Sequence, residues 1–253
     1  SGCSIFMGNH YMIRNYDNHP HSYEGRFVLF QPESGGYATI GPSMQITGRT
    51  DGMNEHGLSI GYNFINRRQS EDGFVCNMIG RMILERAATV DEAVDLLKEI
   101  PHRHSFSYVL IDRSGQSLVV EASPRKVISR EGQYCTNHFQ TLTEKNRYRR
   151  DDSLRREKII RQEKVHIDNA FDAFYMMNDS SRGIFSANYG AWAGTLHTAL
   201  YDTRSLMVGY ALGGDKQPLM INFDQWLKGT DSPIVKIKGS IPSSSAFLNM
   251  EVL

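Results

Sequence analysis

The sequence predicts an α+β fold, and three observations support this prediction. Short apolar runs separated by close turns fill the first part of the chain, two helical patterns follow them, and further strand and helix patterns come after. Because the turns are short, we expect the strands to pair in antiparallel fashion. No internal repeat or low-complexity linker divides the 253 residues, so we expect one domain over residues 1–253, with 213–253 as a mostly irregular C-terminal extension.

Composition and charge exclude several classes of protein. Lys and Arg total 28 and Asp and Glu total 28, so the formal net charge is zero, which excludes a chain built mainly to neutralise nucleic-acid phosphates. With 40% hydrophobic and 22% charged residues, the chain is typical of a globular protein. No apolar run approaches the roughly 18 residues of a membrane-spanning helix. The chain starts at Ser1 and Gly2 without a methionine, so we expect that an upstream segment has been removed, and targeting and compartment stay open.

The cysteine and glycine patterns indicate neither a disulfide scaffold nor a cofactor site. Cys3, Cys76 and Cys135 form at most one pair, which is too few for a disulfide-stabilised fold of this length. His102 and His104 have no neighbours that complete a metal-ligand spacing. The chain contains neither GxGxxG nor GxxxxGK[ST]. We therefore expect no metal ion and no organic cofactor.

A hairpin opens the chain. Residues 3–7 and 11–15 are apolar-rich, and Gly8, Asn9 and His10 separate them as a turn. Asp-Gly and His-Gly pairs indicate tight turns at residues 48–52 and 56–57. The expected strands of this part cover residues 3–7, 11–15, 26–31, 43–47 and 58–64.

Two amphipathic helices follow, and we expect both to lie on a sheet. Residues 74–88 place Met78, Met82 and other apolar residues at helical spacing. Thr89 and Glu92 form a capping box that opens a second helix through residue 100, where Pro101 stops it.

The remaining elements alternate between hairpins and helices. Residues 147–164 are dense in charges of both signs, which predicts a solvated helix with intrahelical ion pairs; the acidic residues interrupt the basic run, so we do not expect nucleic acid to bind here. A last hairpin closes the sheet. The expected strands cover residues 106–112, 116–122, 126–130, 133–136, 195–202 and 206–211, and a further short helix covers 171–177.

Cys3 is the candidate nucleophile. If residues 1 and 2 are removed, its own α-amine, with an unperturbed pKa near 7.7–8.0, can act as the base for its side chain. A thiol makes this task easier, because its unperturbed pKa is only about 8.5. The alternative interpretation is that Cys3 is a small buried hydrophobic residue.

Polar residues near the expected strand ends complete a candidate site. Arg14 and Asp17 follow the first turn, where the second strand returns beside Cys3, so a carboxylate can orient the N-terminal amine and a guanidinium can hold the thiolate. Asn63 and Asn137 each end an apolar strand with an amide that could donate to an oxyanion. For each of them, a turn residue is the alternative.

Five segments follow one another in a characteristic order. They are Cys3, RNYD at 14–17, GMNEHGL at 52–58, YNF at 62–64 and TNH at 136–138. In this order they resemble the linear-amide C–N hydrolases, which include choloylglycine (bile salt) hydrolases, penicillin V acylases and acyl-CoA:6-aminopenicillanate acyltransferases. This family belongs to the N-terminal-nucleophile superfamily, so the resemblance implies a four-layer αββα sandwich.

The resemblance also implies a role for each candidate residue. Cys3 would be the nucleophile, and Arg14 and Asp17 would position its amine and thiolate. Asn63 and Asn137 would line the oxyanion hole, Asn63 through its backbone N–H. The implied reaction is attack on an amide carbonyl, formation of a thioester acyl-enzyme, and transfer of the acyl group to water or to another amine.

Two further expectations come from the resemblance. Some members cut themselves at a Gly-Cys bond before the nucleophile; Gly2 and Cys3 fit that pattern, and they fit a cloning remnant equally well. The family usually carries a later arginine that supports the nucleophile, and Arg182 is the candidate for it, although its sequence context departs from the family pattern.

The sequence thus predicts a cysteine amidohydrolase that cleaves a small linear amide, bile-salt-like or penicillin-like, through a thioester. The alternatives are an acyl-CoA-dependent N-acyltransferase and an inactive small-molecule binding protein on the same fold. The expected partner is a small-molecule amide. We expect neither nucleic acid nor a membrane as a partner, and a homo-oligomer stays open.

Overall fold

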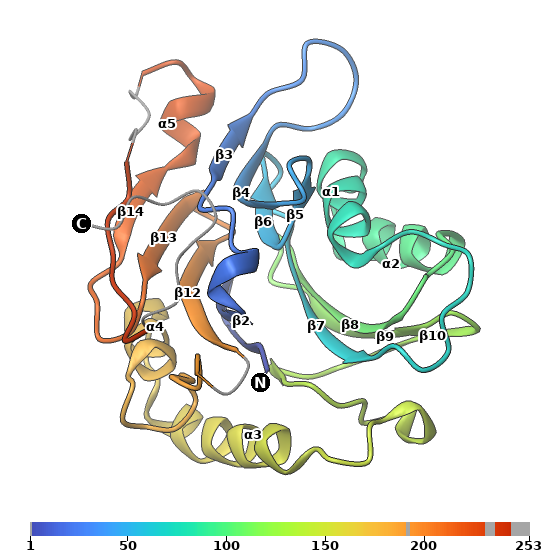
Figure 1. Ribbon diagram of the computed structural model, residues 1–253. Coiled ribbons are helices and arrows are strands. Elements are labelled where there is room, and N and C mark those ends of the chain that lie inside the picture. Colours follow the sequence, from blue (N-terminus) through green and yellow to red (C-terminus); the bar gives the residue numbers. More distant parts are fainter. Residues whose placement is uncertain (1, 191–192, 231–235, 244–253) are drawn as a thin grey trace.

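The computed structural model describes residues 2–190, 193–230 and 236–243. In this part of the chain the strands form two antiparallel sheets that face each other (Figure 1). The six-stranded sheet has the order β11 (Tyr134–Cys135), β1 (Ser4–Gly8), β2 (Tyr11–Asn18), β12 (Gly194–Asp202), β13 (Met207–Leu212), β14 (Leu219–Asn222). The eight-stranded sheet has the order β10 (Lys126–Arg130), β9 (Ser117–Ser123), β8 (Ser105–Ile111), β7 (Ser59–Asn66), β6 (Asp51–Asn54), β4 (Thr39–Met44), β3 (Phe27–Phe30), with β5 (Gly48–Arg49) paired to β4.

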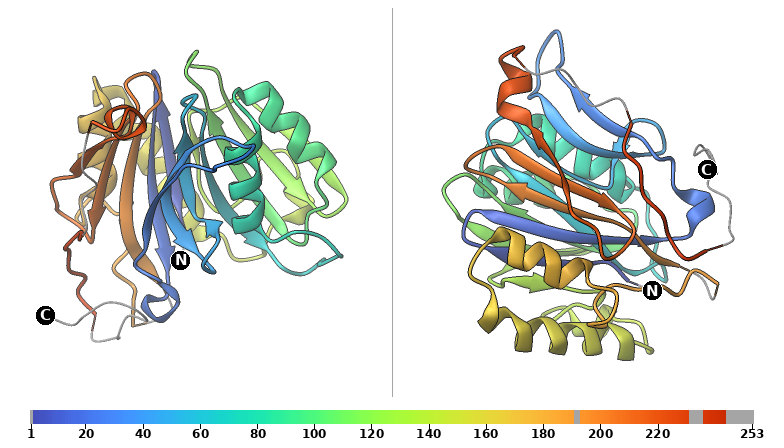
Figure 2. Two further views of the ribbon diagram at one scale, coloured as in Figure 1. Left: turned by 90° about the horizontal axis from the view of Figure 1, so that it is seen from above. Right: turned by 90° about the vertical axis from the view of Figure 1, so that its left-hand side faces the viewer.

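Helices cover the outer faces of both sheets. In Figure 2, α1 (Cys76–Arg86) and α2 (Val90–Glu99) lie outside the eight-stranded sheet, and α4 (Ala170–Asn178) lies outside the six-stranded sheet. The helix α3 (Asp151–Glu163) runs past the ends of the strands near the N-terminus, and α5 (Phe223–Leu227) follows β14. The expected αββα sandwich is therefore confirmed. No helix in the described residues has the length and apolar composition needed to cross a bilayer.

Three hydrophobic clusters fill the three interfaces between the four layers. Successive side chains of a strand point to opposite faces, so one strand supplies two clusters. In β2, Met12 joins the cluster between the sheets and Ile13 joins the cluster under α4. In β8, Val109 faces the other sheet and Leu110 faces α1 and α2. Burial of both faces explains why these strands are almost continuously apolar.

The structure confirms the first hairpin and the capping box. Gly8 pairs with Tyr11, which leaves Asn9 and His10 as a two-residue loop, and His10 has a φ of 63°, in the left-handed region. The Thr89 side chain accepts a hydrogen bond from the backbone N–H of Glu92 at 3.3 Å, as the capping box predicts.

Three expectations about elements are wrong. Residues 48–52 were expected as a turn but form β5 and the start of β6, because Gly52 lets β6 approach β4: a Cβ there would lie 2.7 Å from the Ile40 carbonyl oxygen. The hairpin of β12 and β13 is not the last one, since β14 pairs with β13 despite the preceding Pro218. The charged segment 147–164 is not solvated throughout, because α3 buries Ser153, Arg156 and Ile160.

Candidate active site

Cys3 lies just before β1, at the end of the six-stranded sheet where several polar residues meet. The antiparallel register pairs Ser4 with Asn15 and Asp17 with Thr195, so the start of β1, the end of β2 and the start of β12 share this edge. Figure 1 shows the N-terminus at the same place, between the sheets and close to α3. The Cys3 side chain is almost fully buried.

The sulfur of Cys3 has two donors that favour its ionised form. The backbone N–H of Asp17 donates to Sγ at 3.4 Å, and Nη2 of Arg14 lies 3.7 Å from it. Burial raises the pKa of the thiol, whereas the Arg14 charge and the Asp17 N–H lower it, and burial dominates while Gly2 is attached. The charge and the donor that a thiolate needs are therefore already in place.

Arg14 is fully buried and is held from several sides. Its Nη1 donates to the carbonyl oxygen of Thr50 and pairs with the Asp51 carboxylate at 3.2 Å, and its Nη2 donates to the carbonyl oxygen of Tyr62 at 2.5 Å. The rings of Tyr16 and Tyr62 also lie 5.2 Å and 4.9 Å from the guanidinium carbon. Because strands β2, β6 and β7 all contact this side chain, its position relative to Cys3 is fixed.

Asp17 places a carboxylate beside the peptide nitrogen that precedes Cys3. Its Oδ2 accepts a hydrogen bond from the N–H of Gly2 at 3.3 Å, and its Oδ1 accepts one from the Thr195 hydroxyl at 2.7 Å. Burial raises the pKa of Asp17 to about 6, although Arg156 and these two hydrogen bonds act in the opposite direction. The carboxylate is thus within reach of an amine at the start of Cys3.

The two asparagines lie at the site but differ in what their side chains can do. Both N–H groups of the Asn63 amide are engaged, by the carbonyl oxygens of Cys135 and Thr136 at 3.0 and 3.3 Å. The Asn137 amide donates one N–H to the Phe64 carbonyl oxygen at 2.8 Å, which leaves its second N–H for a ligand. The side chain of Asn63 therefore holds the segment that carries Asn137.

A buried arginine that the sequence analysis treated as part of a solvated helix joins this cluster. Arg156 of α3 is 1% exposed. Its Nη1 donates to the carbonyl oxygen of Cys3 at 3.0 Å and to the Ser4 hydroxyl at 2.6 Å, and its Nη2 donates to Oδ1 of Asn137 at 3.1 Å. By their spacing, Ser153, Arg156 and Ile160 share one face of the helix, but this spacing does not distinguish Arg156 from the other arginines of the segment.

Arg182, the sequence candidate for the later arginine, is not brought to the site. It follows α4 on the surface, where its side chain is 46% exposed and pairs with Asp179 at 2.9 Å and Glu163 at 2.5 Å. These two carboxylates explain its position. Arg156 occupies the place near Cys3 that Arg182 was expected to take.

A buried network behind Arg14 was also missed. The Asp51 carboxylate accepts hydrogen bonds from the Thr50 hydroxyl at 2.7 Å and the Tyr201 hydroxyl at 2.6 Å, and it lies 3.2 Å from Nε2 of His197. Burial alone would raise the pKa of Asp51, but His197 and Arg14 together lower it to about 2. No group of three or more His, Cys, Asp or Glu residues in the described part of the chain is arranged to hold a metal ion.

The signals for this network were weak in the sequence. Asp51 lies in a glycine-rich segment that resembles a turn, and a turn residue is expected to face solvent. His197 and Tyr201 lie four positions apart in β12, so both project from the same face of a buried strand. A polar pair in an otherwise apolar strand indicates a buried polar contact, but it does not identify Asp51 as the partner.

Comparisons with known proteins identify the family and support the fold. The sequence profile of the family described as acyl-coenzyme A:6-aminopenicillanic acid acyl-transferase matches residues 6–217. A mutant of the conjugated bile acid hydrolase from Clostridium perfringens has a similar fold, with a TM-score of 0.65 and 15% identity over 97% of this chain and 100% of that chain. The penicillin V acylase from Agrobacterium tumefaciens is similar with a TM-score of 0.54 and 17% identity over 87% of this chain and 84% of that chain. No curated protein sequence matches the chain.

The Arg14–Asp51 pair predicts a large effect of removing one charge. In Asp51→Asn, the buried guanidinium loses its counter-ion, so we expect the free energy of unfolding to fall by about 3–5 kcal/mol in urea titrations at neutral pH. The matched control is Asp95→Asn, because Asp95 is 73% exposed and pairs with Lys98 on the surface of α2. We expect the control to change stability by less than about 1 kcal/mol. Equal effects of the two substitutions would contradict the proposed importance of the buried pair.

The raised pKa of Asp17 predicts a pH dependence of stability. Between its ordinary value of 3.8 and its folded value of about 6, the folded chain holds a proton that the unfolded chain has lost. The free energy of unfolding is therefore higher at low pH, and it falls by up to about 3 kcal/mol as the pH rises through this window. In unfolding titrations from pH 4 to pH 7, Asp17→Asn should remove this decline; parallel curves for the variant and the wild type would show that Asp17 does not titrate in this way.

Proposed function

Because the chain belongs to the acyl-coenzyme A:6-aminopenicillanic acid acyl-transferase family, we propose that it is a cysteine amidohydrolase that cleaves a small linear C–N amide through a thioester on Cys3. The observation that carries this proposal is the arrangement around the Cys3 sulfur. The Arg14 guanidinium and the Asp17 N–H both approach Sγ, and the Asp17 carboxylate lies beside the peptide nitrogen that precedes Cys3.

The α-amine of Cys3 is the proposed general base. Removal of residues 1 and 2 exposes this amine, and its ordinary pKa near 7.7–8.0 suits proton transfer from a thiol at neutral pH. Gly2 itself fits tightly, because a Cβ at this position would overlap the Asn137 Oδ1 and Arg156 Nη2 atoms. A side chain before Cys3 would therefore displace the groups that surround the reacting bond, which is consistent with cleavage at a Gly-Cys bond.

The thiolate attacks the substrate carbonyl carbon, and the negative charge moves to the carbonyl oxygen. We assign the free N–H of the Asn137 amide to this oxyanion, together with the backbone N–H of Asn63, whose role is implied by the family resemblance. The Arg156 guanidinium on Oδ1 of Asn137 withdraws electron density from the amide, so it strengthens the Asn137 N–H as a donor. Arg156 thus acts through Asn137 and is a positioning residue.

In each half-reaction the α-amine accepts one proton and passes it to the leaving group. In the first, the C–N bond breaks and the departing amine takes the proton that the α-amine received from the thiol, which leaves a thioester on Cys3. In the second, the α-amine takes a proton from water as the oxygen attacks the thioester, and the thiol regains it when the carboxylic acid leaves. Bile-salt-like and penicillin-like amides are the proposed substrates.

One observation favours a second candidate function. The matched family is described by an acyl transfer from coenzyme A to 6-aminopenicillanic acid, so an amine can be the acceptor in place of water. The proposed difference lies only in the second half-reaction, because both functions pass through the same thioester. Adding the amine at increasing concentration distinguishes them: a transferase gives the new amide in proportion to the amine, whereas a hydrolase gives mainly the free acid.

Loss of the Cys3 sulfur should abolish turnover. We expect Cys3→Ala to lower kcat/KM by at least about 1,000-fold for any amide that the wild type cleaves, since no other group can form the thioester. Hydrolysis is measured by release of the amine from a panel of a conjugated bile acid, penicillin V and a phenylacetyl amide, after the intact mass has shown Cys3 as the first residue.

The matched control is Cys135→Ala. Cys135 is also free and buried; its sulfur donates to the Thr136 carbonyl oxygen and contacts the Asn63 side chain, whereas the oxyanion is assigned to the backbone N–H of Asn63. This variant should keep activity within about tenfold of the wild type. Turnover that survives in Cys3→Ala would rule out the thioester mechanism, and binding of these amides without turnover in the wild type would support the binding-protein alternative.

A further inference from the structure

A pocket with an excess of arginine adjoins the candidate active site. We call it the arginine pocket; its volume is about 330 Å³, and it lies where the segment before α3 meets the start of that helix. It is lined by Asn137, Arg147, Arg149, Arg150, Asp151, Asp152, Ser153 and Arg156. Two of these residues, Asn137 and Arg156, also belong to the cluster around Cys3.

The charges of the arginine pocket do not balance within the described residues. Four arginines face two aspartates, and one of these, Asp152, is already paired with Arg155 and Arg156. No ion pair with a carboxylate joins Arg147, Arg149 or Arg150 in the part of the chain that the structure describes. Four arginines against two aspartates leave the described lining with a net charge of +2.

Arg147 contributes to this lining a half-buried guanidinium that has no counter-ion in the described chain. Its guanidinium lies 5.2 Å from the ring of Phe64, and its Nε is buried without a hydrogen-bond partner. Within the described residues no hydrogen bond or ion pair involves the Arg147 guanidinium, so an anionic oxygen at its terminal nitrogens would supply a partner. Burial and the nearby Arg156 also lower the pKa of Arg147, which is the effect expected of a cation that lacks a counter-ion.

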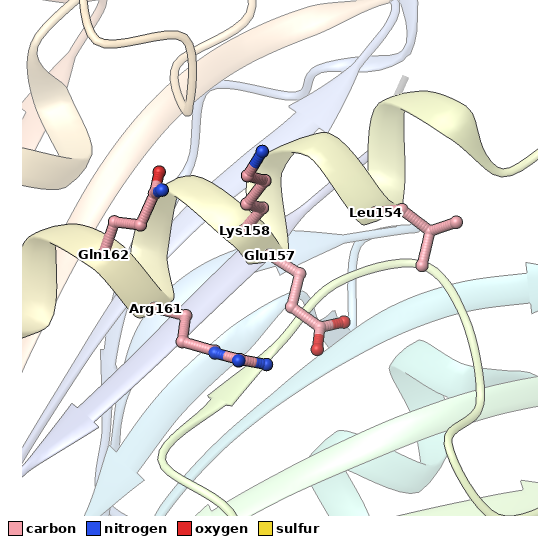
Figure 3. A pocket seen from close by; sticks show the side chains of 5 residues that line it. All are labelled: Leu154, Glu157, Lys158, Arg161 and Gln162. Carbon is pink, nitrogen blue, oxygen red and sulfur yellow. The ribbon is translucent and has the colours of Figure 1, made fainter.

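A second pocket has a smaller excess of cations, with two cations and one acidic residue. It has a volume of about 390 Å³ and is lined by Leu154, Glu157, Lys158, Arg161 and Gln162, whose side chains all come from α3 (Figure 3). Glu157 is an acidic residue among its two cations, and no other element contributes a wall. This helix face provides a control surface of similar basic composition.

We propose that the arginine pocket binds an anionic oxygen group of the substrate, namely a carboxylate, a sulfonate or a phosphate. The inference rests on the proposed function, because it assigns the pocket to the substrate of Cys3. Planar guanidinium groups bind such oxygens with paired hydrogen bonds, and α3 begins at Asp151, so the positive end of its dipole adds to the attraction. Since Arg156 contacts both Cys3 and the pocket wall, a ligand held here lies next to the reacting bond.

The first arm of the test measures binding without catalysis. Inorganic phosphate, sulfate and acetate are titrated into the wild-type chain by calorimetry at low ionic strength. We expect the wild type to bind at least one of them, and Arg149→Ala/Arg150→Ala to bind it at least about tenfold more weakly. Both residues are exposed, so the substitutions should leave the fold intact. Arg161→Ala is the matched control and should bind like the wild type; equal loss in the control, or no binding to the wild type, would overturn the proposal.

The second arm asks which part of the substrate carries the anion. In the first pair, phenylacetylglycine carries a carboxylate on the amine side of the amide, and phenylacetylglycinamide is neutral. In the second pair, the N-succinyl amide of ethanolamine carries a carboxylate on the acyl side, and the N-butyryl amide is neutral. We expect the charged member of one pair to have a KM lower by at least about tenfold, and Arg149→Ala/Arg150→Ala to remove this difference while cleavage of the neutral member continues.

The two proposals fail in different ways. If the wild type cleaves charged and neutral members of both pairs equally well, the arginine pocket does not select the substrate, whereas the amidohydrolase function stands. If no amide is cleaved but phosphate binding still depends on Arg149 and Arg150, the proposed function fails and the pocket remains an anion site.

Discussion

The arrangement around Cys3 depends on one buried ion pair between the two sheets, Arg14 with Asp51. Neither side chain is exposed, so both charges have lost their hydration, and further hydrogen bonds are needed to compensate for that loss. The carbonyl oxygens of Thr50 and Tyr62 accept hydrogen bonds from the two terminal nitrogens of Arg14, and hydroxyl groups and His197 surround Asp51. Because both partners are fixed, the guanidinium stays in place beside the Cys3 sulfur, where it opposes the rise in thiol pKa that burial causes.

The helices and most strands could be predicted from local patterns in the sequence, whereas the four-layer arrangement was implied by the family resemblance. Neighbouring residues specify the short apolar runs, the two-residue turn after Gly8 and the capping box at Thr89, and the structure reproduces these features. The positions of Cys3, Arg14 and Asp17 near one another also follow from a hairpin, since the register of β1 and β2 is set by its short loop. Their proposed roles came from the family resemblance.

The rest of the site could not be predicted because it depends on contacts between distant segments. Asp51 faces Arg14 only after two sheets have packed, and glycine-rich sequence around it indicated a turn. Arg156 reaches Cys3 across a separation of 153 residues, and within its own helix it looks like one more member of a charged run. Arg182, by contrast, satisfies its charge with local carboxylates and stays on the surface. Spacing along the chain does not reveal which arginine is buried.

The most direct measurement of the central claim is the mass of the enzyme after acid quenching during turnover. A slowly cleaved phenylacetyl ester or amide is mixed with the processed chain, the reaction is stopped within seconds, and peptides are analysed by mass spectrometry. The account predicts that the peptide beginning at Cys3 carries the acyl group in a hydroxylamine-sensitive bond, and that Cys3→Ala yields no such adduct. Turnover with an adduct on another residue, or turnover that persists in Cys3→Ala, would contradict the account.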